Sequence, residues 1–197
     1  MDFTDIPPFR LILPAGWEES PADGESVAAL IERGRAVFKS QHRPDLDSEF
    51  SQLMGLSLRK MKQAGVFALY LQTAVPADKV LPLSITAALA HGQLGGTLDR
   101  QVSALFREQS AQFLTDDHTI VHWQSDVEHT GRLSGSSSRN LSYLVPIPGT
   151  QRRSAVQFTT TIPYPTGDDA ETEDLLDDIT LLSDTIISTF AWEPSAS

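Results

Sequence analysis

The fold is decided by residues 139–165, which read RNLSYLVPIPGTQRRSAVQFTTTIPYP, and by the segment ETEDLLDDITLLSDTIISTFAW at 171–192. In the first segment, apolar residues alternate with polar ones on both sides of a central turn, as in strands with one buried face. Pro148 and Gly149 supply the chemistry of that turn. We therefore predict an antiparallel hairpin.

The second segment has the period of an amphipathic helix that packs on this hairpin. Its apolar stripe consists of Leu175, Ile179, Leu182, Ile186 and Phe190. We predict that this stripe is buried and that Phe158 of the hairpin is fully buried beneath the helix. The helix carboxylates that we expect to be largely exposed are Asp174, Asp177, Asp178 and Asp184.

The rest of the chain adds helices and further strands. We predict strands over 9–13, 66–72, 81–91 and 118–133, helices over 25–40, 46–63 and 97–113, a loop of Pro, Gly and Asp between Trp17 and the first of these helices, and a polar loop over 134–139. Thr97 is the expected N-cap of the helix at 97–113. Strands that follow one another directly favour an antiparallel sheet packed with helices, an α+β fold, over alternating parallel units. At 197 residues the chain is long enough for a single domain, 1–197, with a real core.

The composition excludes several classes of function. The chain has no cysteine, which rules out disulfides, thiolate metal sites and a cysteine nucleophile. A net charge of −11 opposes binding to nucleic acid or to an anionic membrane. The start, MDFTDIPPFR, lacks the pattern of a signal peptide, and no apolar run is long enough to span a membrane. We therefore predict a cytoplasmic protein.

The acidic charge is concentrated, because seven acidic residues fall within 168–178. One interpretation is a solvated helix face that keeps the protein in solution. The other is an acidic docking surface for a basic partner. The sequence leaves both interpretations open.

The side chains that could carry chemistry do not form a recognisable site. His118 and His122 are four residues apart beside Asp116 and Asp117, but in a strand this spacing separates them by about 13 Å, too far to share a metal ion. His129 and Glu128 could reach either histidine only by cross-strand pairing. The glycine-rich GQLGGT (92–97) has no following lysine, and GRLSG (131–135) is not a nucleophile elbow. We predict no catalytic residue, no metal and no cofactor.

Three segments carry a resemblance to a known family. LPAGW (13–17), SYLVPIPGTQRRSAVQFTTT (142–161) and STFAW (188–192) resemble actinobacterial proteins of unknown role. Their fold is the α/β sandwich of the photosystem II extrinsic subunit PsbP and the Ran-binding nuclear import factors. The resemblance implies a PsbP-like fold and a binding protein that is not an enzyme, and it carries over no functional residue. The chain departs from the family in lacking a lipoprotein signal and in the two helices within 20–63.

Three tryptophans are the candidates for partner binding. Trp17, Trp123 and Trp192 each lie in a strand or at the end of an element, where the ring can close the core or present its indole N–H to a partner. The leading hypothesis is a non-enzymatic, cytoplasmic interaction or accessory protein, with a chaperone-like role as one form, whose partner is another protein. The alternative is a small-molecule-binding protein or weak hydrolase with a pocket between the sheet and the helices of 25–63.

Overall fold

The computed structural model describes residues 6–40, 54–55, 57–76, 79–131, 134–167 and 170–194, and for residues 33–40 it describes the backbone alone. Its strands are β1 (Phe9–Arg10), β2 (Trp17–Pro21), β3 (Val66–Gln72), β4 (Ser84–His91), β5 (Gln112–Phe113), β6 (Val121–Glu128), β7 (Ser136–Pro146), β8 (Ser154–Pro165) and β9 (Ala191–Trp192). Its helices are α1 (Gly24–Ser40), α3 (Asp99–Glu108) and α4 (Ala170–Ser188), with a short 3-10 turn at Gln93–Gly95. Residues 54–55 and 57–63 are also helical.

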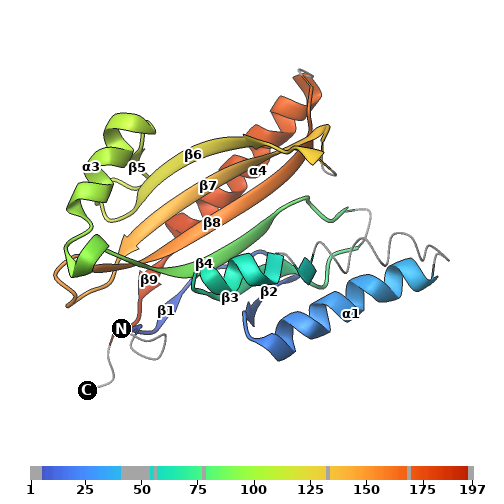
Figure 1. Ribbon diagram of the computed structural model, residues 1–197, viewed down its shortest axis with the longest axis horizontal. Helices are drawn as coiled ribbons and strands as arrows, with labels where there is room; N and C mark the ends of the chain where they lie inside the picture. The colour runs from blue at the N-terminus through green and yellow to red at the C-terminus, as the bar shows by residue number, and fades with distance from the viewer. Residues whose placement is uncertain are drawn as a thin grey trace.

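Seven of the strands form one antiparallel sheet in the order β2-β3-β4-β8-β7-β6-β5, while β1 and β9 pair in a small second sheet (Figure 1). The predicted hairpin lies at the centre, where β7 and β8 pair from Ser136 opposite Pro165 to Pro146 opposite Ala155. Strands β3 and β4 pair antiparallel as a second predicted hairpin. The predicted α+β fold with an antiparallel sheet is therefore confirmed.

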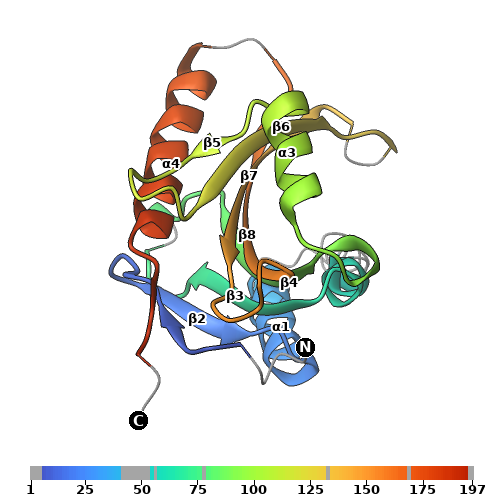
Figure 2. The ribbon, with the colours of Figure 1, turned by 90° about the vertical axis from the view of Figure 1, so that its left-hand side faces the viewer.

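Helix α4 covers one face of β7 and β8, and the main core lies between them (Figure 2). Alternate residues of the two strands point into this core, among them Tyr143 and Phe158. Phe158 has 0% of its surface exposed, so its predicted burial is confirmed. Its ring packs edge-on against Phe9 and Phe190, with centroids 5.9 and 5.8 Å away. The burial of each side chain of this size stabilises the fold by about 1.5–3 kcal/mol.

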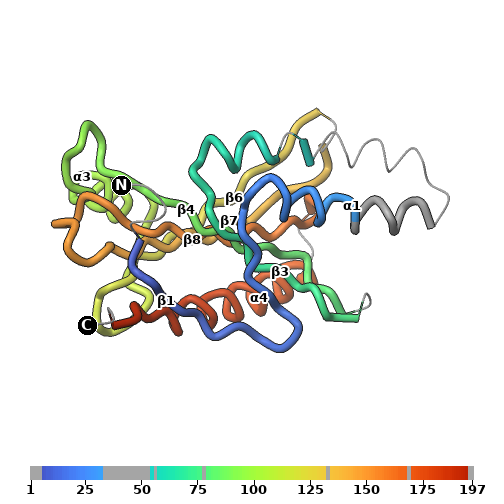
Figure 3. The backbone as a smooth tube through the Cα atoms, turned by 90° about the horizontal axis from the view of Figure 1, so that it is seen from below, coloured from blue at the N-terminus to red at the C-terminus, as the bar shows by residue number. Residues whose placement is uncertain are grey.

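Helix α3 packs on the opposite face of the sheet. Leu98 and Leu105 form a second apolar cluster there with Trp123 and Leu144. Figure 2 shows α4 on one side of β7 and β8 and α3 on the other. Figure 3 shows α3 and α1 toward opposite ends of the molecule. Strand β7 is therefore buried on both faces in its second half, which explains why its sequence there, YLV, is continuously apolar.

The buried stripe of α4 differs from the prediction. The side chains that it buries are Leu176, Ile179, Ser183, Ile186 and Ile187. Leu175 was predicted to be buried and is 45% exposed, so that prediction is wrong. The adjacent leucines 175 and 176 fit the same helical period, and tertiary contacts choose between them. Ser183 meets the hydroxyls of Tyr143 and Thr160, which orients the helix with Leu176 inward.

Several predicted elements have other bounds in the structure, among them the strands predicted over 81–91 and 118–133, which are β4 and β6. Helix α4 stops at Ser188, and Ala191–Trp192 instead pairs with Phe9–Arg10, which is all that remains of the strand predicted over 9–13. Helix α3 is shorter than the predicted 97–113, because the chain turns back after Glu108 to form β5. Thr97 does not cap it: the N-cap residue is Leu98, and no side chain bonds to the cap.

Two segments predicted as loops belong to the sheet. Trp17–Pro21 forms β2, which pairs with β3 over its whole length. The serine run enters β7 at Ser136, and its backbone pairs with β8 although its side chains are polar. Part of the helix predicted over 46–63 lies outside the described residues, and its described part is helical. None of the helices in the described part of the chain is both long and apolar enough to cross a membrane.

Candidate functional site

Strand β6 has a backbone edge that its outer neighbour covers only at the start. Strand β5 pairs with it at two positions, Val121 and His122, whereas β7 pairs along the whole of β6. Figure 1 shows β5 beside the beginning of β6 and no strand beside the rest. Within the described residues, therefore, no strand pairs with the outer edge from Trp123 to Glu128.

Alternate residues of this edge direct their backbone groups away from the sheet. His129 donates its N–H to the Ser136 carbonyl at 3.0 Å, on the β7 side. Because the hydrogen bonds of an antiparallel strand alternate between its two sides, the odd-numbered residues of β6 bond to β7. The residues whose N–H and C=O groups face outward are Gln124, Asp126 and Glu128.

The side chains of this edge are accessible on both faces of the sheet. All residues from Gln124 to Glu128 are exposed, including Val127 at 44%. A cleft of about 440 Å³ adjoins them, lined by residues 122–126 of β6 and by Gln109, Ser110 and Gln112 from the turn after α3 and from β5. The edge is thus open to another chain along its side and at the cleft.

Helix α4 runs beside this edge, and Arg139 of β7 joins the two. The buried guanidinium places Nε 3.2 Å from Asp126, Nη2 3.3 Å from Glu173 and Nη1 3.6 Å from Asp177. Burial acts to lower the pKa of Arg139, but the hydrogen bonds and charges of Asp126 and Glu173 outweigh it and raise the pKa. One cation thus faces three carboxylates, and the contact keeps a net negative charge.

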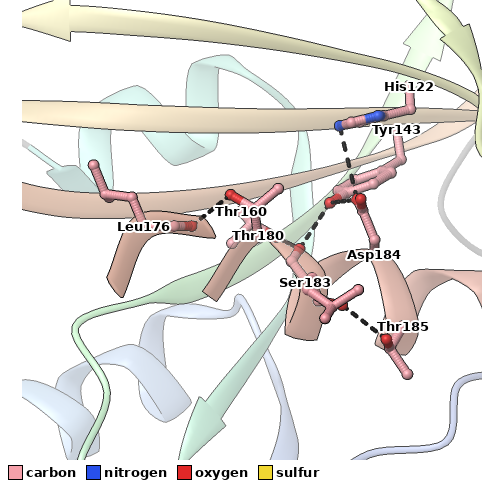
Figure 4. Close-up of polar contacts among 9 residues, drawn as sticks. His122, Tyr143, Thr160, Leu176, Thr180, Ser183, Asp184 and Thr185 are labelled. Atoms are coloured by element: carbon pink, nitrogen blue, oxygen red, sulfur yellow. Dashed lines mark hydrogen bonds and ion pairs between the residues drawn. The ribbon is translucent and has the colours of Figure 1, made fainter. Parts of the chain in front are cut away.

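A buried polar cluster lies further along the same side of α4 (Figure 4). Asp184 Oδ1 accepts a hydrogen bond of 2.7 Å from the Tyr143 hydroxyl and lies 3.8 Å from Nε2 of His122. Ser183 Oγ lies 2.9 Å from the Tyr143 hydroxyl and 2.6 Å from Thr160 Oγ1. Asp184 was predicted to be largely exposed, which is wrong, because its carboxylate contacts Tyr143 and His122 in this cluster.

Four carboxylates thus lie between β6 and α4. We call Asp126, Glu173, Asp177 and Asp184 the acidic seam.

His122 joins this cluster without a hydrogen bond of its own. It is 6% exposed, its ring stacks on Tyr143 with centroids 4.8 Å apart, and neither ring nitrogen has a hydrogen-bond partner among the described residues. Burial lowers the pKa of His122, and the Asp184 carboxylate opposes only part of that effect. The imidazole is therefore neutral at pH 7. Burial and Asp184 also raise the pKa of Tyr143, so its hydroxyl remains a donor.

The three tryptophans lie in separate parts of the structure. Trp17 and Trp123 are each 9% exposed, Trp17 in the main core and Trp123 in the cluster under α3. Trp192 is half-buried and packs edge-on against Phe9 and Phe190. Trp123 lines the cleft beside β6, and Trp192 lines another cleft of about 530 Å³ next to the β7–β8 turn. Their role in partner binding stays a prediction, and of the three only Trp123 adjoins the open edge.

A pocket lies between the sheet and the helices of 25–63, where the alternative function, a small-molecule-binding protein or weak hydrolase, requires one. It measures about 440 Å³ and lies between the start of β3, the start of α1 and the helical residues 58–62. Its titratable side chains are Asp23, Arg59 and Lys62. Asp23 accepts a hydrogen bond of 2.7 Å from the Ser26 N–H at the start of α1, and this bond lowers its pKa. The pocket therefore combines a helix-capping carboxylate with two cations.

The histidines considered as metal ligands are in different surroundings. His118 lies in the turn before β6, with a φ of 56°, and its ring packs against Phe113. His122 is buried under α4, and His129 contacts Ser138 at 2.7 Å. Across the described ranges, no group of three His, Asp or Glu side chains is arranged to hold a metal ion.

Comparison with known proteins identifies no family. No protein-family model matches the sequence, and no curated protein matches it either. A solved structure that is similar is a point mutant of protein Mog1, with a TM-score of 0.42 and 13% sequence identity over 65% of this chain and 80% of that one. At this similarity the match bears on neither function nor partner. Membership of the PsbP-like superfamily stays a prediction.

Sequence reasoning missed the open edge, and of the seam it found only the acidic segment 168–178, with a docking surface for a basic partner as one interpretation. The segment VHWQSDVE does contain a signal, since four of its last five residues are polar and they fall on both faces of the strand. A strand whose end is polar on both faces is typical of an uncovered sheet edge. The shortness of β5 and the approach of α4 depend on contacts between distant segments and have no local signal.

Proposed function

We propose that this protein binds other polypeptides and takes an extended segment of its partner as an added strand beside β6. The observation that carries the proposal is the row of outward-facing backbone groups of Gln124, Asp126 and Glu128. Exposed N–H and C=O groups on a strand edge are a template for another strand. Main-chain hydrogen bonds supply the affinity in this mode of recognition, and alternate side chains supply the specificity.

The two edges of the sheet support this choice of site. Natural proteins protect edge strands with proline, bulges, charged side chains or a covering segment. The charged side chains on the β6 edge, Asp126 and Glu128, are acidic, so they repel an acidic segment but not a basic one. Strand β2, at the opposite edge, ends in Pro21. The open part of β6 contains no proline, pairs with β7 without a bulge, and adjoins a cleft. The non-enzymatic role and the cytoplasmic setting stay predictions within this proposal.

Proline substitution tests the edge directly. Gln124→Pro removes an outward N–H and leaves the bonds to β7 in place, whereas Ser125→Pro removes an N–H that bonds to β7. We expect Gln124→Pro to melt close to the parent protein and Ser125→Pro to melt well below it. Gln124→Ala, which keeps the N–H, is the control for loss of the side chain.

Binding is measured with peptides selected from a random display library against the parent protein. We expect a selected peptide to slow amide hydrogen exchange at Gln124, Asp126 and Glu128. Gln124→Pro should weaken binding about three- to tenfold, the effect of one backbone hydrogen bond, and Gln124→Ala should not. Equal binding to Gln124→Pro, or protection confined to other amides, would overturn the proposal.

A second candidate function is the binding of a small anionic molecule in the pocket beside β3. The observation that favours it is the pair of cations, Arg59 and Lys62, on the lining. The test is thermal melting with inorganic phosphate and with citrate, on the parent protein and on Lys62→Gln. A stabilisation that Lys62→Gln removes would support this candidate, and melting that neither anion changes would exclude those anions.

A further inference from the structure

The open edge of β6 and the acidic seam lie side by side, and they run in line with each other over a similar length. At one end Arg139 connects Asp126 of β6 to Asp177 of α4, and further along His122 of β6 approaches Asp184 of α4. Four residues of a strand span about 13 Å and seven residues of a helix about 10 Å, so β6 and α4 run alongside each other between the two contacts. The carboxylates of the seam thus follow the direction of the strand edge.

We propose, resting on the function above, that the segment taken by β6 is basic, with Lys or Arg at alternate positions that face α4. A strand added to β6 lies about 4.8 Å from it and sends every second side chain to the face that carries α4. The side chains of Gln124, Asp126 and Glu128 also lie on that face, because His122, an even-numbered residue like them, stacks on Tyr143 and approaches Asp184 of α4. The long stems of Lys and Arg reach the seam from there.

The charge of the seam is available to a partner. Side-chain exposure is 43% at Asp126, 57% at Glu173 and 81% at Asp177, and Arg139 is the cation that contacts them within the described residues. Glu128 adds a further exposed carboxylate on the strand itself. Rows of acidic side chains beside an open edge favour positive partners and repel negative ones, and such complementarity sets specificity and association rate.

The same charges disfavour a second copy of this chain as the occupant. Two copies that paired edge to edge through β6, with Asp126 or Val127 at the centre of the pairing, would bring acidic residues of one copy opposite acidic residues of the other. Like charges directly opposite in a sheet are destabilising. A basic segment from a different protein has no such penalty.

The test uses short peptides of defined pattern and the full-length protein. The first peptide alternates Lys with Thr, a residue that favours strands. The second alternates Glu with Thr, and the third repeats the Lys–Thr peptide with every backbone amide methylated, so that neither of its edges has an N–H to donate. The third keeps the charge but cannot form the ladder, so it separates strand addition from general attraction to an acidic protein. Affinity is measured by fluorescence anisotropy and the site by amide exchange.

Two double variants test the seam against a matched control. Glu173→Gln with Asp177→Asn removes two carboxylates of the seam while Asp126 still pairs with Arg139. Asp174→Asn with Asp178→Asn removes two exposed carboxylates one residue further along the same helix, which turns them about 100° away from Arg139. Thermal melting of both variants establishes that they remain folded.

We expect the Lys–Thr peptide to protect the amides of Gln124, Asp126 and Glu128 and to bind better than both other peptides. Its affinity should fall about two- to fivefold per seam carboxylate removed and should change little in the control variant. Equal losses in the two variants, or equal binding of the methylated peptide, would mean general attraction and overturn the inference.

The remaining outcomes distinguish a failure of the basic-segment inference from a failure of the proposed strand addition at β6. If library-selected peptides protect the edge amides but the Glu–Thr peptide binds as well as the Lys–Thr peptide, the edge binds polypeptides and the basic partner is wrong. If no peptide protects those amides, both proposals fail. If the protein alone forms a dimer by sedimentation, with the edge amides already protected, the occupant is a second copy and the inference is overturned.

Discussion

Tyr143 donates a hydrogen bond of 2.7 Å from its hydroxyl to Asp184, which joins the central strand β7 to the helix that covers it. The same hydroxyl lies 2.9 Å from Ser183 Oγ, and Ser183 reaches Thr160 on the neighbouring strand. A helix that packed on apolar contacts alone could slide or rotate, whereas these bonds require one orientation. The cluster therefore sets where α4 lies and, with it, where the acidic seam meets β6.

Tyr143→Phe should destabilise the protein by about 1–3 kcal/mol, because Asp184 and Ser183 each lose a buried partner. The measurement is urea unfolding at pH 7. Tyr164→Phe, at the half-buried end of β8, is the control and should change the free energy of unfolding by less than about 0.5 kcal/mol. Equal effects of the two substitutions would contradict a role for the Tyr143 hydroxyl.

His122 should make stability depend on pH. Its pKa is lowered in the folded protein, mainly by burial, so below the ordinary histidine pKa of about 6.5 the unfolded chain takes up the proton first. Above about pH 6.5, therefore, His122 does not lower the free energy of unfolding. As the pH drops from there toward the pKa of His122 in the folded protein, the free energy of unfolding falls by at most about 1.4 kcal/mol per pH unit.

The check is the free energy of unfolding between pH 8 and pH 5 for the parent protein and His122→Phe, which keeps a ring against Tyr143. We expect the variant to lack the part of the decline that begins near pH 6.5. Parallel curves for the two proteins would show that His122 contributes nothing to the pH dependence.

Phe158→Ala should cost about 3–5 kcal/mol, because it leaves a cavity among aromatic rings that are already in contact. Phe158 is fully buried and touches Phe9, Tyr70 and Phe190. Urea unfolding measures the loss. A cost below about 1 kcal/mol would mean that the neighbouring rings close the cavity.

Ile187→Ala and Leu175→Ala should differ although both lie on α4. Ile187 is fully buried, so its truncation should cost about 2–5 kcal/mol, whereas the exposed Leu175 should cost less than about 1 kcal/mol. Thermal and urea unfolding of both variants give the comparison. The opposite order would mean that the helix packs on its sequence-predicted stripe.

Much of the architecture could be predicted from the sequence because it depends on local periodicity. The alternation over 139–165 specifies two strands and a turn, and β7 and β8 form them. The order of elements also predicts the antiparallel sheet, since consecutive strands pair most easily with their neighbours. Phe158 could be placed in the core because it lies on the same face of its strand as the apolar Val156 and Ile162.

The features of the candidate site were decided by tertiary structure. Leu175 and Leu176 fit the helical period equally well, and the hydroxyls of Tyr143 and Thr160 select the second by bonding to Ser183. Pairing of β1 with β9 joins residues 9–10 to residues 191–192, a contact with no local signal.

The sequence by itself predicted a strand over 118–133, within which β6 lies, and determined that 168–178 is acidic. It could not determine that β5 is too short to cover β6, or that Arg139 brings the acidic helix to that edge. Both depend on contacts between residues far apart in the chain, whose free energy appears only when the whole sheet has formed. The open edge and its charge are therefore properties of the tertiary structure.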